Sequence, residues 1–155
     1  MSDPATDRTD EERDLLETLA GLPSFYHPTA GPAGGRVAMY YDGTGRNELH
    51  VLDPATGDIG QWTDGQVPRD ARWHLRWGAR GDRVFYHRDD AGDEQNDLHA
   101  VDRDGHSEAV VEMDGQVVLA DVGADGETLL VGSTRDGQMN LYRHDLSTKI
   151  GRAHV

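Results

Sequence analysis

The sequence predicts an all-β protein: about three four-stranded blades of an incomplete β-propeller, preceded by a short N-terminal helix. After residue 23, short runs such as RVAMYY, RVFYHR and TLLVGS are rich in residues that favour strands. Clusters of Gly, Asp and Pro separate the runs, and the chain has 19 glycines, as many tight turns require. The pattern also repeats, with about four strands in each unit of roughly 40–50 residues, which is typical of propeller blades.

The helix is predicted within TDEERDLLETLAG. Thr9 is a suitable N-cap, and Glu12 three residues later completes a capping box. Gly21 and Pro23 end the helix. Its apolar stripe consists of Leu15, Leu16 and Leu19.

Three segments align with one another: GGRVAMYYDGTGRNELHVLD, GDRVFYHRDDAGDEQNDLHAVD and GETLLVGSTRDGQMNLYRHD. Each reads as a strand, a glycine turn, a second strand and an aspartate turn. The middle copy has two extra residues after Gly92, where a loop insertion is expected. The matched residues are Val37, Val84 and Leu129; Gly45, Gly92 and Gly137; Leu49, Leu98 and Leu141; and Asp53, Asp102 and Asp145.

The repeat divides the chain into an N-terminal acidic segment with its capping helix (1–22) and blades at about 23–65, 66–114 and 115–148. A β-sandwich also has one strand about every 8–12 residues, but it does not account for a matched repeat. Each blade has an apolar face that only a neighbouring blade can bury. Because propellers close with about four to eight blades, we expect this chain to be a fragment of a longer protein.

Residues 149–155 differ from everything before them. Lys149 is the single lysine, and IGRAHV after it lacks strand alternation. The segment resembles one reading frame of a widely used DNA-sequencing adapter, whose leading bases would complete the lysine codon. The alternative is a natural basic tail. We expect residues 149–155 to be an adapter artefact and exclude them from functional reasoning.

The charge pattern excludes some classes of function. The chain has 29 acidic and 15 basic residues, a net charge of -14 that repels nucleic acid. Dispersed acidic residues and arginine in place of lysine are typical of salt-adapted, haloarchaeal proteins; a GC-rich genome in an acidic lineage is the alternative. There is no cysteine, no signal-peptide pattern and no apolar run of roughly 18 residues, so we expect a halophilic, cytoplasmic protein without membrane contact.

The segment HRDDAGDEQNDLHAVD and the opening LPSFYHPTAGPAGGRVAMYYDGTGRNELHVLD resemble the N-terminal propeller of the prolyl oligopeptidase family of serine peptidases. The resemblance covers about residues 15–148, and TolB-type propellers share such repeats. It implies a larger parent, in which the propeller restricts an α/β-hydrolase domain with a Ser-His-Asp triad to short peptides. The hydrolase domain, which would be the partner of this segment, is missing here. The resemblance therefore implies no catalytic residue and no cofactor or metal site.

One serine and one acidic loop are candidates for a catalytic or a metal-binding role. Ser107 in GHSEA is near the nucleophile-elbow pattern, but that elbow needs a helix after the serine, and a strand is predicted here. Asp89, Asp90, Asp93, Glu94 and Asp97 crowd one loop. Ala91 and Gly92 occupy positions that a calcium loop needs, so a solvated loop is expected, or one that faces the hydrolase domain.

Other candidates have structural explanations. His50 and His99 align with Tyr142, so they are repeat positions, and His154 lies in the tail. Glu11 and Glu12 resemble the paired glutamates of some dipeptidyl peptidases, but helix capping explains them. Trp73 and Trp77 are predicted on one face of an extended segment, where they pack between blades; ligand stacking is the alternative.

The sequence therefore favours a substrate-gating propeller fragment of a cytoplasmic serine peptidase that acts on short peptides. The alternative is a non-enzymatic, TolB-like propeller that binds protein partners. A third possibility is a propeller fused to another catalytic or sensor domain.

Overall fold

A computed structural model describes residues 9–89, 95–148 and 150–153. It contains one α-helix, one short 3₁₀ helix and three antiparallel sheets of four strands each. The helices are α1 (Asp10–Ala20) and η1 (Pro32–Gly34). The first blade consists of β1 (Phe25–Ala30), β2 (Val37–Tyr41), β3 (Glu48–Leu52) and β4 (Ile59–Gln61). The second consists of β5 (Arg76–Trp77), β6 (Arg83–Asp89), β7 (Asn96–Asp102) and β8 (Ser107–Val111). The third consists of β9 (Val117–Val122), β10 (Thr128–Ser133), β11 (Asn140–Asp145) and β12 (Ile150–Ala153).

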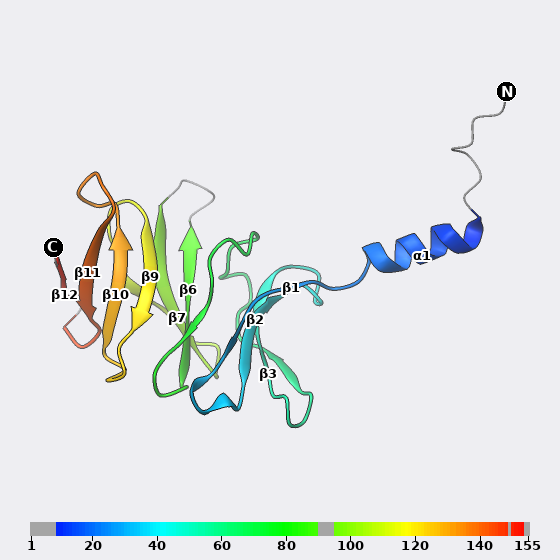
Figure 1. Cartoon of the computed structure of the whole chain (residues 1–155), viewed down its shortest axis with the longest axis horizontal. Coiled ribbons are helices and arrows are strands. Elements are labelled where there is room, and N and C mark those ends of the chain that lie inside the picture. The colour runs from blue at the N-terminus through cyan, green and yellow to red at the C-terminus, as the bar shows by residue number, and fades with distance from the viewer. Residues whose placement is uncertain (1–8, 90–94, 149, 154–155) are drawn as a thin grey trace.

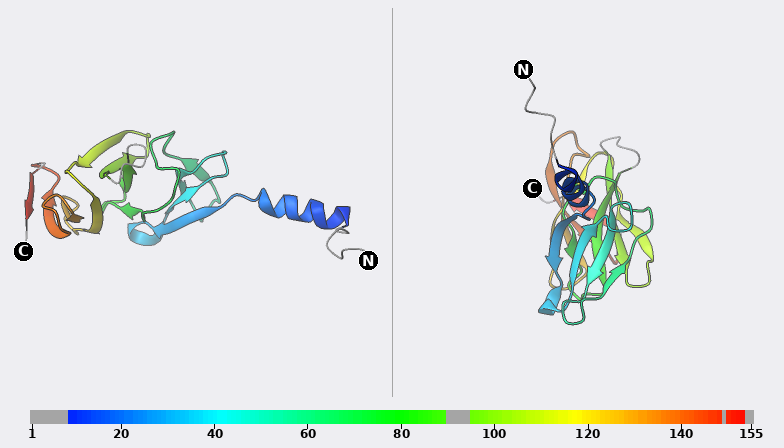
Figure 2. Two further views of the ribbon diagram at one scale, coloured as in Figure 1. Left: turned by 90° about the horizontal axis from the view of Figure 1, so that it is seen from above. Right: turned by 90° about the vertical axis from the view of Figure 1, so that its right-hand side faces the viewer.

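The three blades stand side by side in an arc that does not close (Figures 1 and 2). Within each blade, consecutive strands are neighbours, so the chain runs up and down from one edge of the sheet to the other. The first strands of the blades contact one another, β1 with β5 and β5 with β9, which makes them the innermost strands of the arc. This arrangement agrees with the predicted fold class.

Helix α1 begins as predicted. The side chain of Thr9 accepts a hydrogen bond from the backbone of Glu12, and the side chain of Glu12 accepts one from the backbone of Thr9. No residue of α1 is buried, and its leucines are exposed, Leu15 at 58%. The helix extends away from the first blade (Figures 1 and 2).

The matched glycines and aspartates form the turns. Gly45 and Gly137 have φ angles of 102° and 84°, a left-handed conformation that favours glycine. Gly92 lies outside the described residues. The matched aspartates Asp53 and Asp145 each accept a hydrogen bond from the backbone N–H two residues later. These bonds stabilise the turn that follows the third strand of the blade.

Two apolar clusters join the blades. The first lies between the first and second blades and consists of Ala38, Tyr40, Leu49, Val51, Trp62, Val67, Leu75, Trp77, Val84, Tyr86 and Val101. The second lies between the second and third blades and consists of Phe85, Leu98, Ala100, Val111, Val117, Leu119, Leu129, Val131 and Tyr142. Stability therefore comes from contacts between neighbouring blades, as in other repeat architectures.

The C-terminal segment differs from its expectation. The segment IGRAHV lacks strand alternation in the sequence, yet β12 pairs with β11, from Asp145 opposite Ile150 to Tyr142 opposite Ala153. The outer edge of a strand offers backbone donors and acceptors whatever side chains the added strand carries, so weak strand alternation does not prevent this pairing. The adapter origin of residues 149–155 stays a prediction.

Among the described residues, no helix is both long and apolar enough to cross a membrane.

Candidate functional site

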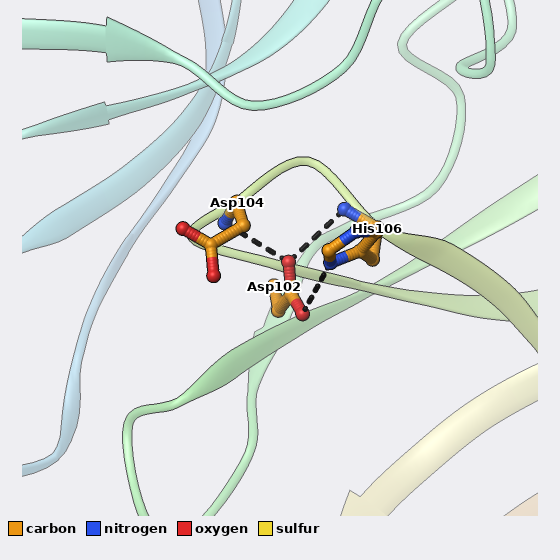
Figure 3. A group of neighbouring side chains, drawn as sticks. All are labelled: Asp102, Asp104 and His106. Carbon is orange, nitrogen blue, oxygen red and sulfur yellow. Dashed lines mark hydrogen bonds and ion pairs between the residues drawn. The ribbon is translucent and has the colours of Figure 1, made fainter.

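The hairpin between β7 and β8 brings three potential ligand groups together (Figure 3). Asp102 accepts hydrogen bonds through Oδ1 from the backbone N–H groups of Asp104 at 2.9 Å and His106 at 3.0 Å. Its Oδ2 lies 3.4 Å from Nδ1 of His106. One ligand atom from each of the three side chains lies within 4.8 Å of the others, and such a donor set can bind a divalent cation.

The repeat gives this hairpin a structural explanation. Asp53 and Asp145 accept hydrogen bonds from the backbone of Ala55 and Ser147, each at 2.9 Å, in the equivalent turns of the other blades. Slight burial raises the pKa of Asp102, but the backbone hydrogen bonds from His106 and Asp104 outweigh it and hold the pKa below its ordinary value. The carboxylate therefore stabilises a turn, and metal binding is not needed to explain it.

An open depression of about 620 Å³ lies beside this hairpin. Arg36, Arg83 and Arg103 line it together with Asp82 and Glu108. The Nη2 atom of Arg36 donates to the carbonyl of Gly81 at 2.6 Å, so this guanidinium connects the first and second blades. The mixed charges give the depression no clear preference for an anion or a cation.

Ser107 has the hairpin surroundings that the sequence predicts. It begins β8, and a strand, not a helix, follows it. Its hydroxyl shares a hydrogen bond with the hydroxyl of Tyr86. His106, its neighbour in sequence, pairs with Asp102. The side chains of Ser107 and His106 are thus paired with two other residues, Tyr86 and Asp102.

The predicted acidic loop lies largely outside the described residues, since Asp90, Asp93 and Glu94 are not among them. Asp89 ends β6 and Asp97 lies on β7. The calcium-loop interpretation of this segment stays untested.

The structure separates Trp73 and Trp77, and the prediction that they share a face is wrong. Trp77 is buried in the cluster between the first and second blades, where its Nε1 donates to the carbonyl of Thr29 at 3.0 Å. The ring of Trp73 lies 5.5 Å from that of His87. Only Arg76 and Trp77 form the strand, so alternation does not extend back to Trp73. Packing between blades is confirmed for Trp77.

His87 is a buried residue that sequence reasoning missed. Its Nε2 accepts a hydrogen bond from the backbone of Leu119 in the third blade at 2.9 Å. Burial, together with nearby His74, lowers the pKa of His87 to about 3. The neutral imidazole therefore belongs to the junction between the second and third blades. His87 lies opposite Leu98 on the neighbouring strand, and no local signal in the sequence marks it as buried.

Glu48 is a second missed residue, with a fully buried carboxylate in the first blade. Its oxygens accept hydrogen bonds from the hydroxyl of Thr63 at 2.6 Å and the backbone of Gly65 at 2.7 Å, and Nε of Arg46 lies 2.9 Å away. These partners compensate for burial of the charge. Nothing in the local sequence marks this glutamate as buried.

The two end blades of the arc have exposed apolar side chains, although Met39, His50 and Glu48 on the outer face of the first blade are buried. On the third blade, Leu130, Met139 and Leu141 are 36%, 54% and 49% exposed. On the first blade, Phe25 and Ile59 are 61% and 47% exposed. Large apolar side chains are thus exposed on both end blades of the arc.

Solved structures share this architecture. TolB from Acinetobacter baumannii matches with a TM-score of 0.65 and 16% identity, over 84% of this chain and 32% of its own. Puromycin hydrolase matches with a TM-score of 0.63 and 18% identity, over 84% of this chain and 20% of its own. The β-propeller domain of the Trilobed protease from Pyrococcus furiosus, which has an open velcro topology, matches with a TM-score of 0.57 and 13% identity, over 84% of this chain and 41% of its own.

The chain has the fold of a partial β-propeller. The predicted fold class is thereby confirmed, with three blades where the similar structures have longer chains. It spans about a third of the length of TolB and a fifth of that of puromycin hydrolase. No protein-family model and no curated protein matches the sequence. The propeller blades resemble those of both TolB and peptidases.

Proposed function

We propose that this partial propeller is the N-terminal, substrate-gating portion of a cytoplasmic serine peptidase of the prolyl oligopeptidase family. The observation that carries the proposal is the unclosed arc of three blades, with exposed apolar side chains on both end blades, which a longer propeller would extend. The likeness to the propeller domain of a protease and to puromycin hydrolase supports it.

The proposed role is steric. The innermost strands β1, β5 and β9 would border the central passage, which admits extended peptides and excludes folded proteins. In the parent, a serine in another domain would attack the peptide carbonyl, release the amine and form an acyl-enzyme that water then hydrolyses. In this proposal the nucleophile lies outside this segment, and the hydroxyl of Ser107, which shares a hydrogen bond with that of Tyr86, has a structural role.

The net charge of -14 and the single lysine support two further parts of the proposal. The parent would belong to a salt-adapted cytoplasm, where high ionic strength screens repulsion among the carboxylates. Residues 149–155 would be adapter-derived, which also accounts for the lysine.

A TolB-like propeller that binds protein partners without catalysis is the second candidate. The likeness to TolB, with a TM-score of 0.65, favours it. In that case, the partner would bind to the rim of the blades, and no hydrolase domain would accompany them.

The uninterrupted gene beyond Thr148 distinguishes the two candidates. We expect further blades followed by a strand, a G-x-S-x-G segment and a helix. The purified full-length product should react with a fluorophosphonate probe and cleave peptides of about ten residues, but not folded proteins; the 155-residue chain should not react. A full-length product that has only blades and no probe reactivity would contradict the peptidase and favour the TolB-like protein.

A further inference from the structure

The junction between the second and third blades contains three buried nitrogen atoms that have no hydrogen-bond partner within the described part of the chain. They are Nδ1 of His87, Nε2 of His74 and Nε of Arg76. Both blades of this junction have all four strands, so the site does not depend on where the sequence begins or ends. Buried polar atoms are nearly always hydrogen-bonded in folded proteins, so a group of three in one place needs an explanation.

The three side chains reach two consecutive residues of β9. Nε2 of His87 accepts a hydrogen bond from the backbone N–H of Leu119 at 2.9 Å, and Nη2 of Arg76 donates to the carbonyl of Ala120 at 3.1 Å. His74 also forms a hydrogen bond with the backbone of Leu119. Its ring centroid lies 6.2 Å from that of His87. The three nitrogen atoms therefore belong to one cluster beside the innermost strand of the third blade.

His87 and Arg76 contribute two hydrogen-bond donors to this cluster. A neutral imidazole carries a single hydrogen, and Nε2 of His87 uses its lone pair to accept from Leu119, so the hydrogen is on Nδ1. Burial, together with His74, lowers the pKa of His87 to about 3, and the ring is therefore neutral near pH 7. Nε of Arg76 is a donor in any case, because a guanidinium has no acceptor.

His74 contributes the acceptor. Burial and Arg76 lower its pKa, against a smaller opposing effect of the hydrogen bond with the backbone of Leu119. A hydrogen bond that raises the pKa of an imidazole is one in which the ring donates, so its partner here is the carbonyl of Leu119. The donor is Nδ1, because Nε2 has no partner in the described chain. Nε2 of the neutral ring is then left with its lone pair.

Direct contacts and bound ions do not satisfy these three atoms. A ring nitrogen lies about 1 Å from its ring centroid, so two rings with centroids 6.2 Å apart cannot form a direct hydrogen bond. A cation would meet the hydrogen on Nδ1 of His87 and the positive charge of Arg76. An anion would meet the lone pair on Nε2 of His74. The occupant that fits accepts two hydrogen bonds and donates one.

We propose that one buried water molecule binds here, accepting hydrogen bonds from Nδ1 of His87 and Nε of Arg76 and donating one to Nε2 of His74. About three hydrogen bonds to otherwise unsatisfied polar groups is the usual number for a buried water. The water connects the three side chains that hold the second blade to β9, and it is thus part of the junction. The inference concerns this junction alone and does not rest on the proposed peptidase function.

Nitrogen-15 NMR of the histidine rings in the 155-residue chain tests the hydrogen positions at pH 7. We expect His87 and His74 both to carry their hydrogen on Nδ1, and the ring hydrogen of His87 to show cross-relaxation with a long-lived water. His106, which is exposed, is the reference and should show no slowly exchanging ring hydrogen. A hydrogen on Nε2 of either buried ring would overturn the proposal.

A high-resolution crystal structure of the same chain identifies the occupant. We expect one density peak within about 2.7–3.2 Å of all three nitrogen atoms. The peak should be free of anomalous signal after bromide replaces chloride in the crystal, because a halide would be revealed by that exchange. An anomalous peak, a metal ion or no density at this position would each contradict a bound water.

His74→Phe removes the acceptor and retains an aromatic ring. Oxygen-17 relaxation dispersion counts the water molecules that a protein holds for long times, and the count should fall by one in His74→Phe. His106→Phe is the matched control at an exposed histidine and should leave the count unchanged. Circular dichroism checks that both variants are folded. Equal counts in the wild-type chain and a folded His74→Phe variant would refute the proposed site.

Discussion

Trp62, which follows β4, and Trp77 of β5 meet edge to face, with ring centroids 5.8 Å apart and ring planes at 80°. The guanidinium of Arg36 lies over both rings, 5.9 Å and 5.1 Å from their centroids. These contacts connect the first blade to the second at the buried cluster between them. The stability of this junction can therefore be tested at a single aromatic pair.

We expect Trp77→Ala to lower the free energy of unfolding by about 3–5 kcal/mol, because it removes a buried ring and leaves a cavity. A double-mutant cycle with Trp62→Ala, measured by chemical denaturation, should give a coupling energy of about 0.5–1.5 kcal/mol. Trp73→Ala is the control, since Trp73 lies outside the cluster, and its effect should be smaller. Strictly additive losses in the cycle would contradict direct contact between the two rings.

His87 makes the junction between the second and third blades sensitive to acid. Its pKa is about 3 in the folded chain, against an ordinary value of 6.5. Between these values the unfolded chain binds a proton that the folded chain does not, so stability falls as the pH falls below about 6.5. Above that pH both states are neutral and the contribution to the slope disappears. The slope should approach about 1.4 kcal/mol per pH unit.

His87→Gln should reduce this slope, because an amide oxygen can accept the hydrogen bond from Leu119 without titrating. Some slope should remain, because burial and Arg76 also lower the pKa of His74. Urea denaturation between pH 7 and pH 4 measures the effect. His106→Gln, at an exposed histidine, is the matched control. An unchanged slope in His87→Gln would show that His87 is not buried in its neutral form.

Alanine substitutions at Gly137 and Gly35 separate the effect of backbone conformation on stability from the effect of packing. A Cβ at either glycine would meet no atom within 4 Å. Gly137 has a φ of 84°, whereas Gly35 has a φ of -86°. Gly137→Ala should therefore cost about 1 kcal/mol, and Gly35→Ala should be neutral or stabilising by about 0.4–1 kcal/mol. Thermal unfolding of the two variants measures the difference, and equal melting temperatures would contradict the assigned turn.

Glu48 should matter more to stability than a glutamate in a surface ion pair. Glu48→Ala leaves the Thr63 hydroxyl and the Gly65 N–H without their acceptor, at a cost of about 3 kcal/mol. Glu127 forms an exposed pair with Arg80 at 3.0 Å, and Glu127→Ala should change stability by less than about 0.5 kcal/mol. Denaturant titration of both variants makes the comparison, and similar losses would argue against the buried network.

The sequence alone determined the features that depend on nearby residues. The capping box at Thr9, the aspartate turns and the glycine turns at Gly45 and Gly137 require only contacts within a few positions. The repeat predicted the number of blades because each copy has the same local order of strand and turn.

The tertiary structure decided which surfaces are covered. It separated Trp73 from Trp77, buried Glu48 and His87, paired β12 with β11 and left Leu130 and Leu141 of the third blade exposed. These outcomes depend on contacts between blades or between strand edges, where the partners lie far apart in the sequence. Periodicity places a residue on one face of a strand, but only the position of the neighbouring blade determines whether that face is buried.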